Sequence, residues 1–356
     1  MTLDNRIEAF SELGKFLRQT EPDESKINNH ALKDLFYNDL KDLITQVAIY
    51  NPWFTEENTK KAIAAIAQQL NKNSLEAFVE PYRAAILKNK EAKQIAVIMA
   101  GNIPLVGFHD FLCVLLSGNR FMGKLSSDDK YLLPFLAKVL ISIEPEFANY
   151  IEFTEGQLKN IQAVIATGSN NTARYFEYYF SKYSSIIRKN RNSIAVLTGK
   201  ETKEELRRFG EDIFQYFGLG CRSVSKLFVP KGYTFDSFYE SMMPYKDIIN
   251  INKYANNYDY NRTVYLMAND PGLLDNNFLL LKESREYASP IGVLFYEFYD
   301  DLQQLNERFD KDVDQIQCIV SSDPGVKKSI PFGQAQCPLW NDYADGVDTM
   351  QFLLNQ

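Results

Sequence analysis

The residue with the clearest capacity for covalent chemistry is Cys221, in the stretch GLGCRS. Gly218 and Gly220 remove side-chain bulk, so a substrate carbonyl could approach both the sulfur and the neighbouring backbone N–H groups. A thiolate at this position could attack that carbonyl and hold the acyl group as a thioester. The alternative is a cysteine that packs as a small apolar residue. Cys221 lies outside any apolar run, which favours the chemical interpretation.

The other cysteines and the histidines indicate less. Cys113 and Cys318 lie in the apolar runs FLCVLL and IQCIVS and fit buried packing. The four cysteines have no CxxC spacing, which favours thiols over a disulfide framework or a zinc site. With His30 and His109 as the sequence's two histidines, we expect no metal centre. His109 could act as a general acid or thiolate partner, or could pack within a helix.

Strands that alternate with helices would position such a nucleophile. A helical lead-in of about ninety residues comes first, with Thr55 as an expected N-cap. Apolar runs at 94–100, 121–126 and 163–168 are each followed by turn residues and a helical pattern. This alternation predicts a parallel sheet that binds a nucleotide at the carboxyl ends of its strands.

The second half predicts another α/β layer. Its expected helices cover residues 204–217, 235–245 and 301–309. Its expected strands cover residues 224–230, 278–283, 291–298 and 316–321. The loop that carries Cys221 would therefore join a helix to a strand.

Composition excludes several classes of protein. A chain of 356 residues exceeds what one hydrophobic core usually supports, so we expect two domains. The net charge is -7 and the basic residues are interspersed with acidic ones, so the sequence gives no basic patch that would bind nucleic acid. No apolar run approaches the ~20 residues of a membrane span, and the N-terminus lacks the apolar core of a secretory signal. We therefore expect a cytoplasmic location.

From about residue 90 to the C-terminus, the order of segments resembles the aldehyde dehydrogenase superfamily. It is most similar to the acyl-CoA reductases that include the fatty acyl reductase of bacterial luminescence. The resemblance implies two α/β domains, a Rossmann-like cofactor domain and a catalytic cysteine domain. We expect the lead-in and NAD(P)-binding domain at 1–196 and the catalytic domain at 197–340. Residues 341–356 would form a tail that could serve as a return or oligomerisation strand.

Three segments of the first half carry the resemblance. In AVIMAGNIPLVGFHDF, Asn102 matches the amide that helps to bind the thioester oxyanion, although Asn is also a common turn residue. In SGNRFMGKLSS, Lys124 matches the lysine that contacts the adenosine ribose or its phosphate, with Ser126 and Ser127 beside it. In IATGSNNTARYF, Gly168 and Ser169 match a turn at a helix N-terminus that favours the cofactor's phosphates. A plain helix cap is the alternative for that serine.

Two segments of the second half also carry the resemblance. KKSIPFGQAQCPLW resembles the Pro-Phe-Gly segment that lines the mouth of the active site. ASPIGVLFYEFYDD resembles a Gly-Pro-Val strand, with the order changed because Pro290 precedes Gly292. Glu286 or Glu283 would then be the carboxylate that holds the nicotinamide ribose, although a surface glutamate is the alternative for each.

One departure from the family pattern bears on the reaction. Acid-forming aldehyde dehydrogenases carry a water-activating Glu in an E-L-G-G-K segment, whereas the corresponding stretch here reads RKNRNSIAVLTGK. A site without that base would keep its acyl-enzyme from hydrolysis. This difference favours a thioester reductase.

The resemblance implies NADPH-dependent reduction of a long-chain acyl-CoA to an aldehyde, with an acyl-protein as the alternative substrate. Cys221 would carry the acyl group, and its own N–H and the Asn102 amide would hold the oxyanion. The alternatives are a cysteine acyltransferase or thioesterase without nicotinamide chemistry, and a non-catalytic interaction protein of the same fold. A homo-oligomer formed by pairing of sheet edges is a further possibility.

Overall fold

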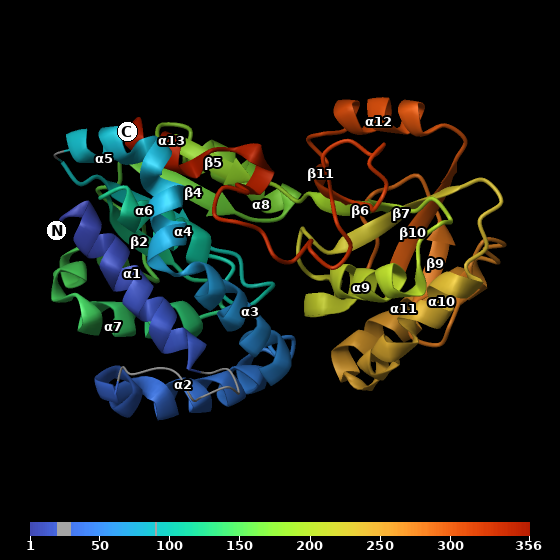
Figure 1. The fold of residues 1–356 in the computed structure, drawn as a ribbon, viewed down its shortest axis with the longest axis horizontal. Coiled ribbons are helices and arrows are strands. Elements are labelled where there is room, and N and C mark those ends of the chain that lie inside the picture. Colours follow the sequence, from blue (N-terminus) through green and yellow to red (C-terminus); the bar gives the residue numbers. More distant parts are fainter. Residues whose placement is uncertain (20–29, 90) are drawn as a thin grey trace. The chain divides into compact units, whose positions relative to one another are not determined.

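The computed structural model of the chain describes residues 1–19, 30–89 and 91–356 (Figure 1). Residues 20–29, which fall within the expected helical lead-in, and residue 90 lie outside the described residues. The fold is mixed α/β with largely parallel sheets. The expected fold class is therefore confirmed.

The chain forms two compact units. Unit 1 consists of Met1–Lys189 and Leu339–Gln356, and unit 2 consists of Asn190–Pro338. Each unit contains its own sheet and its own apolar core. The C-terminal segment thus belongs to the same unit as the N-terminus, and both termini are labelled within unit 1 in Figure 1.

The lead-in of unit 1 is helical, as expected. Its helices are α1 (Leu3–Arg18), α2 (His30–Tyr50), α3 (Glu56–Gln69), α4 (Lys72–Val79) and α5 (Arg83–Lys88). The Thr55 side chain accepts a hydrogen bond from the Asn58 N–H, which confirms Thr55 as the N-cap of α3. Thr2 caps α1 in the same way through the Asn5 N–H. The apolar faces of these helices join one core with the helices that follow.

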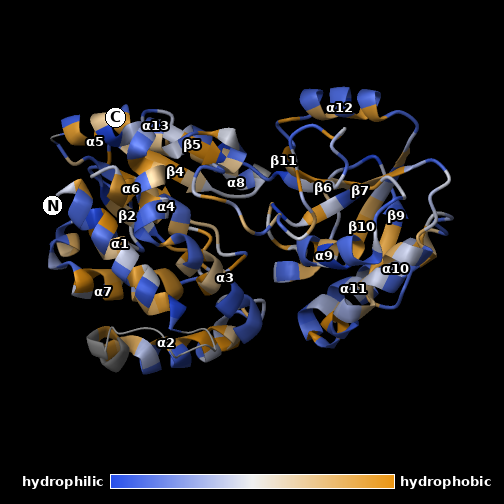
Figure 2. Ribbon diagram, viewed as in Figure 1, coloured by the Kyte–Doolittle hydropathy of each residue, from blue (hydrophilic) through white to orange (hydrophobic). Residues whose placement is uncertain are grey.

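Within the described residues of unit 1, five parallel strands pair in the order β3-β2-β1-β4-β5. They are β1 (Gln94–Ile98), β2 (Arg120–Lys124), β3 (Ile151–Phe153), β4 (Ala163–Thr167) and β5 (Ser184–Arg188). The helices between them are α6 (Phe108–Leu116), α7 (Leu132–Ile143) and α8 (Asn170–Tyr179). Because crossover helices cover a parallel sheet, its central strands β1 and β4 are buried apolar runs. Figure 2 shows α7 as strongly hydrophobic.

The order of this sheet creates a switch point. From β1 the chain continues outward through β2 and β3, then returns to add β4 and β5 on the other side of β1. In open parallel sheets, ligands bind outside the carboxyl ends of the strands at such a point. The loops after β1, β2 and β4 therefore meet at one edge of unit 1.

Within the described residues of unit 2, seven strands pair in the order β12-β11-β6-β7-β10-β9-β8, with β8 antiparallel at the edge. They are β6 (Asn192–Val196), β7 (Val224–Pro230), β8 (Leu274–Asp275), β9 (Leu280–Glu283), β10 (Val293–Tyr299), β11 (Ile316–Val320) and β12 (Ser329–Ile330). The helices are α9 (Lys203–Phe214), α10 (Asp236–Met242), α11 (Asn252–Met267) and α12 (Leu302–Lys311). Figure 2 shows α12 as predominantly hydrophilic, in keeping with a surface helix. Short 3-10 turns complete the two units at Glu80–Tyr82, Pro145–Asn149, Gln215–Gly218, Met243–Asn250 and Ala344–Gly346.

The C-terminal segment differs from expectation. Instead of a strand it forms helix α13 (Thr349–Leu354), capped by the Asp348 side chain, which accepts from the Gln351 N–H. Its buried residues are Thr349, Met350 and Leu353, which have helical spacing. Because α13 packs against α6 within unit 1, this segment is an intramolecular element. The expectation of a C-terminal strand, including a strand that pairs subunits, is therefore wrong.

Candidate active site

Cys221 lies on the turn between α9 and β7, and its side chain is exposed. The Cys221 carbonyl accepts a hydrogen bond from Ser193 Oγ at 2.9 Å, which ties the turn to β6. Ser193 is fully buried, and its hydroxyl also lies 3.0 Å from Cys318 Sγ. Within the turn, the Ser223 N–H donates to the Gly220 carbonyl at 3.0 Å. The thiol therefore projects from a backbone that is held at two points.

The backbone before this turn is strained. Tyr216, Phe217 and Gly218 have φ values of 52°, 59° and 77° in succession. Left-handed backbone costs a residue other than glycine about 1–2 kcal/mol. The Tyr216 and Phe217 side chains are only 6% and 7% exposed, so burial of their rings offsets that cost. The helix expected over 204–217 therefore ends early, at Phe214, and three left-handed residues lead into the turn that carries Cys221.

The PFG segment (residues 331–337) lies against the residues that follow Cys221. Arg222 Nε donates to the Ala335 carbonyl at 2.5 Å. Gln336 Nε2 donates to Ser223 Oγ at 3.1 Å. This segment was singled out by resemblance alone, and in the structure it contacts the two residues directly after the thiol.

Asp212 on α9 is a functional candidate that sequence reasoning missed. Its carboxylate is fully buried and accepts from the Gly333 N–H at 2.6 Å and the Ala335 N–H at 2.8 Å. Burial raises the pKa of the Asp212 carboxyl to about 7. The available signal was an acidic residue on an apolar helix face, because Asp212 lies beside the buried Phe209 and Ile213 at helical spacing.

In unit 1, the candidate oxyanion residue Asn102 and the candidate cofactor residues follow adjacent strands. Asn102 is exposed in the loop after β1. Lys124 is the last residue of β2, and its Nζ lies 3.2 Å from the Gly156 carbonyl oxygen. Ser126 Oγ accepts from the Asp128 N–H at 3.2 Å. Since β1 and β2 are neighbours in register, with Ile98 beside Lys124, these loops leave the same sheet edge together.

Gly168 and Ser169 follow β4, on the other side of β1. Ser169 caps α8, because its Oγ accepts from the Thr172 N–H at 3.2 Å. A Cβ on Gly168 would lie 3.0 Å from the Thr172 Cβ, so a glycine keeps this turn close to the helix. A helix N-terminus at the switch point favours phosphate groups. These residues therefore fit a dinucleotide at the carboxyl edge of the unit 1 sheet.

His109 lies in a different environment from the one a general acid needs. It is part of α6, where its ring contacts Phe78, Trp340 and Tyr343. Its Nε2 lies 2.8 Å from the Trp340 carbonyl oxygen, and burial lowers its pKa. These contacts favour the packing alternative for His109 over catalysis.

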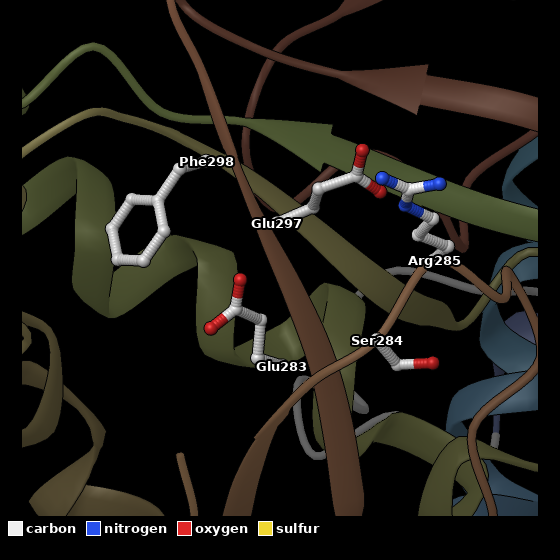
Figure 3. A pocket seen from close by; sticks show the side chains of 5 residues that line it. All are labelled: Glu283, Ser284, Arg285, Glu297 and Phe298. Atoms are coloured by element: carbon white, nitrogen blue, oxygen red, sulfur yellow. The ribbon is translucent and has the colours of Figure 1, made fainter.

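The two glutamates near β9 differ in their surroundings. Glu283, the last residue of β9, lines a hollow of about 370 Å³ together with Ser284, Arg285, Glu297 and Phe298 (Figure 3). Glu286 is exposed in the loop beyond it, and its N–H donates to Ser284 Oγ at 3.2 Å. In Figure 3 the carboxylate of Glu283 projects toward the Phe298 side of the hollow.

Buried charges anchor the loop that carries these glutamates. Lys226 on β7 is fully buried, and its Nζ contacts the Ser284 carbonyl and, at 2.8 Å, Glu297 Oε2. Arg308 Nη1 donates to Glu297 Oε1 at 2.6 Å. Burial lowers the pKa of Lys226, whereas the Glu297 carboxylate raises it. The start of the loop is thus fixed to the central strands of unit 2.

Across residues 1–19, 30–89 and 91–356, no group of three or more His, Cys, Asp or Glu side chains is placed to hold a metal ion. The described helices include none that is both long enough and apolar enough to cross a bilayer.

Structural comparison shows the fold. Aldehyde dehydrogenase 21 of Physcomitrella patens, solved with its product succinate, is similar with a TM-score of 0.62 and 11% identity over 91% of this chain and 74% of that one. Lactaldehyde dehydrogenase of Escherichia coli has a TM-score of 0.59 and 13% identity, with 90% and 75% covered. Glyceraldehyde-3-phosphate dehydrogenase GapN of Methanocaldococcus jannaschii, solved with NADP, has a TM-score of 0.54 and 11% identity, with 91% and 77% covered.

Sequence comparison shows the family. The model of the family described as acyl-CoA reductase (LuxC) matches residues 39–243, more than half of the chain. A comparison with curated proteins finds no significant match. The chain therefore belongs to the acyl-CoA reductase (LuxC) family, has the aldehyde dehydrogenase fold, and is an oxidoreductase of the acyl/aldehyde couple.

Proposed function

We propose that this protein reduces a long-chain fatty acyl-CoA to the aldehyde with NADPH, through an S-acyl intermediate on Cys221. The observation that carries the proposal is the exposed thiol of Cys221 in a chain of the acyl-CoA reductase family. Its turn is hydrogen-bonded to Ser193 and contacts the PFG segment. An acyl-protein is a second possible donor of the acyl group. We also retain a cytoplasmic location and a homo-oligomer as parts of the proposal.

In the first step the Cys221 thiolate attacks the thioester carbonyl carbon. The oxyanion that develops is stabilised by the Cys221 N–H and, by the family resemblance, by the Asn102 amide. When the tetrahedral species collapses, the bond to the coenzyme A sulfur breaks, and that sulfur leaves as a thiolate that takes up a proton. The acyl group is now bonded to Cys221.

When bound, NADPH supplies a hydride for the acyl carbon. The resulting hemithioacetal oxyanion reforms its carbonyl, the carbon–sulfur bond to Cys221 breaks, and the aldehyde is released with the thiolate regenerated. The residues that would hold the cofactor are Lys124, Ser126, Gly168 and Ser169 in unit 1, with Glu286 or Glu283 for the nicotinamide ribose. The resemblance offers both glutamates, and Glu283 also lines the hollow described above.

The stretch after β6 supports reduction over hydrolysis. β6 ends at Val196, which is fully buried, and the carboxylate nearest in sequence is Glu201. Glu201 Oε1 accepts from the Thr198 N–H at 2.6 Å, and Oε2 accepts from the Gly199 N–H at 3.0 Å. A carboxylate occupied in this way is a poor base for water. The acyl-enzyme would therefore persist until it is reduced.

The decisive assay follows NADPH consumption, coenzyme A release and aldehyde formation together, with palmitoyl-CoA as substrate. The proposal expects all three in equal amounts. Release of coenzyme A without NADPH consumption would instead show a thioesterase or acyltransferase. Absence of all three products across several chain lengths would favour the non-catalytic alternative, and a thermal shift with NADPH would then test whether the cofactor binds at all.

Lys124 provides a test of cofactor assignment. We expect Lys124→Ala to raise KM for NADPH about tenfold, because a charge-assisted contact to phosphate is lost, and to change KM for NADH much less. The matched control is Lys130→Ala, since Lys130 is exposed a few residues further along the same loop. Steady-state kinetics with both cofactors measure the effect. An equal rise in KM for NADPH and NADH would contradict a contact to the 2'-phosphate.

A further inference from the structure

The Asp212 carboxylate joins α9 to the PFG segment by both of its oxygens. Oδ2 accepts from the Gly333 N–H at 2.6 Å and Oδ1 accepts from the Ala335 N–H at 2.8 Å. Gly333 has a φ of 80°, and a Cβ there would lie 3.2 Å from the carbonyl oxygen of Arg208 on α9. The segment therefore packs directly on the helix, and two charge-assisted hydrogen bonds fix its position and orientation.

The same segment continues from Asp212 to the residues after the thiol. Ala335 receives the Asp212 bond at its N–H and the Arg222 Nε bond at its carbonyl. Gln336, the next residue, donates to Ser223 Oγ. Hence Asp212 connects through Ala335 and Gln336 to the two residues that follow Cys221. On its other side the turn is held by Ser193 on β6.

We propose that Asp212 is a positioning residue that holds the Cys221 turn in its reactive geometry through Gly333 and Ala335. This inference rests on the proposed function only in taking Cys221 as the nucleophile. Asp212 does not itself touch the reacting atoms. Its effect on Cys221 would pass through Arg222, Ser223 and the PFG segment.

The charges around Asp212 define when it can act. Burial is the largest effect and raises the pKa of Asp212, the two N–H bonds and Arg222 act to lower it, and Glu211 acts to raise it. The resulting pKa is about 7. Burial raises the pKa values of Cys337 and Tyr245, and the Asp212 charge adds to both effects. Below about pH 7 the carboxyl is protonated, so one oxygen becomes a hydroxyl and the bonds lose their charge assistance. The turn is therefore held most firmly above pH 7.

As the pH rises, the contribution of Asp212 to folding stability and its contribution to Cys221 reactivity change in opposite directions. The folded pKa of Asp212 is above its ordinary value of 3.8, so the folded state binds this proton more tightly than the unfolded state does. Stability contributed by Asp212 is thus present below about pH 4 and declines as the pH rises toward 7. If Asp212 only stabilised the fold, its effect would be smallest above pH 7. If it positions the Cys221 turn, its effect is largest there.

The test compares Asp212→Asn with wild type by the rate at which iodoacetamide alkylates Cys221, resolved by mass spectrometry of its peptide from about pH 6 to about 9. An Asn can accept from one of the two N–H groups but presents an NH₂ to the other. We expect Cys221 alkylation to slow about tenfold above pH 7 and to change much less below it. Loss of a negative charge alone would stabilise the thiolate and speed alkylation, so an unchanged or faster rate overturns the proposal.

Matched variants keep the test decisive if Asp212→Asn does not fold. Gln336→Ala and Ser223→Ala each remove the Gln336–Ser223 bond and leave the Arg222–Ala335 bond in place, so we expect each to slow alkylation by a smaller factor, about threefold. Glu211→Gln is the control, because Glu211 precedes Asp212 on α9 and accepts from Tyr245 Oη. Normal rates in both link variants also overturn the proposal. The readout needs neither acyl-CoA nor NADPH, so failure of the proposed function would appear separately in the assay of products.

Discussion

Replacing Cys221 with Ser is expected to reduce palmitoyl-CoA-dependent NADPH oxidation by about 10³-fold or more, because a serine hydroxyl without an activating base is a far weaker nucleophile than a thiolate. The Ser193 bond goes to the Cys221 backbone carbonyl, so the substitution leaves that attachment of the turn in place. Coenzyme A release should fall in parallel, since the same sulfur starts both steps. Paired assays of NADPH and coenzyme A measure the loss.

Cys337→Ser is the matched control for this variant. Cys337 is also an exposed residue and ends the PFG segment in the same unit. Partial desolvation of its thiol and the nearby Asp212 charge raise its pKa, so it is the weaker nucleophile candidate. We expect it to retain most of the activity. A second readout is the mass of the protein after incubation with palmitoyl-CoA and without NADPH. One palmitoyl group should appear on wild type and on Cys337→Ser but not on Cys221→Ser. Full activity in Cys221→Ser would rule out the S-acyl mechanism.

The sheet of unit 1 was predictable because its signals are local. The run at 94–100 contains β1, whose central residues Ile95, Ala96 and Val97 are fully buried on both faces of the sheet. Uninterrupted apolar stretches of this kind indicate parallel strands from composition alone. Once the strands are parallel, their carboxyl ends must share an edge. That reasoning anticipated that Lys124 and Gly168 would lie at the carboxyl ends of parallel strands, and the structure adds that these strands, β2 and β4, lie on either side of β1.

Other elements lack a local signal. Helix α11 was not predicted, because its buried positions are Tyr254, Tyr258 and Asn261, and an apolar periodicity is therefore missing. The C-terminal helix was mistaken for a strand, because a six-residue apolar segment is short enough to suit either state. Its burial against α6 decides the matter, and that contact joins segments far apart in the sequence.

The candidate site shows the same limit. Cys221 could be singled out from its two neighbouring glycines, whereas Asp212 could not, since its N–H donors come from Gly333 and Ala335, far along the chain. A buried carboxylate becomes meaningful only when its partners are known. His109 also depends on distant partners. Its residue type allowed either catalysis or packing within a helix, and the rings of Phe78, Trp340 and Tyr343 around it favour packing.

A buried ion pair in unit 1 leads to the second large expected effect. Arg188, the last residue of β5, donates to both oxygens of Asp110 on α6 at 2.5 and 2.7 Å. It also donates to Thr349 Oγ1 at 3.2 Å, which connects the pair to α13. The Arg188 and Asp110 side chains are 9% and 5% exposed. Asp110→Ala should therefore destabilise unit 1 by about 3–5 kcal/mol, because it leaves a buried guanidinium without its counter-charge.

Adding Arg188→Met to Asp110→Ala should reduce the loss of unfolding free energy. The double variant Asp110→Ala/Arg188→Met removes both charges, and replacing a buried pair by apolar groups is often close to neutral, so we expect it to be more stable than Asp110→Ala alone. Urea unfolding followed by tryptophan fluorescence suits the comparison, because both tryptophans, Trp53 and Trp340, belong to unit 1. A double variant as unstable as Asp110→Ala would mean that the cost is lost packing. A single variant within about 1 kcal/mol of wild type would mean that water already screens the pair, which its burial argues against.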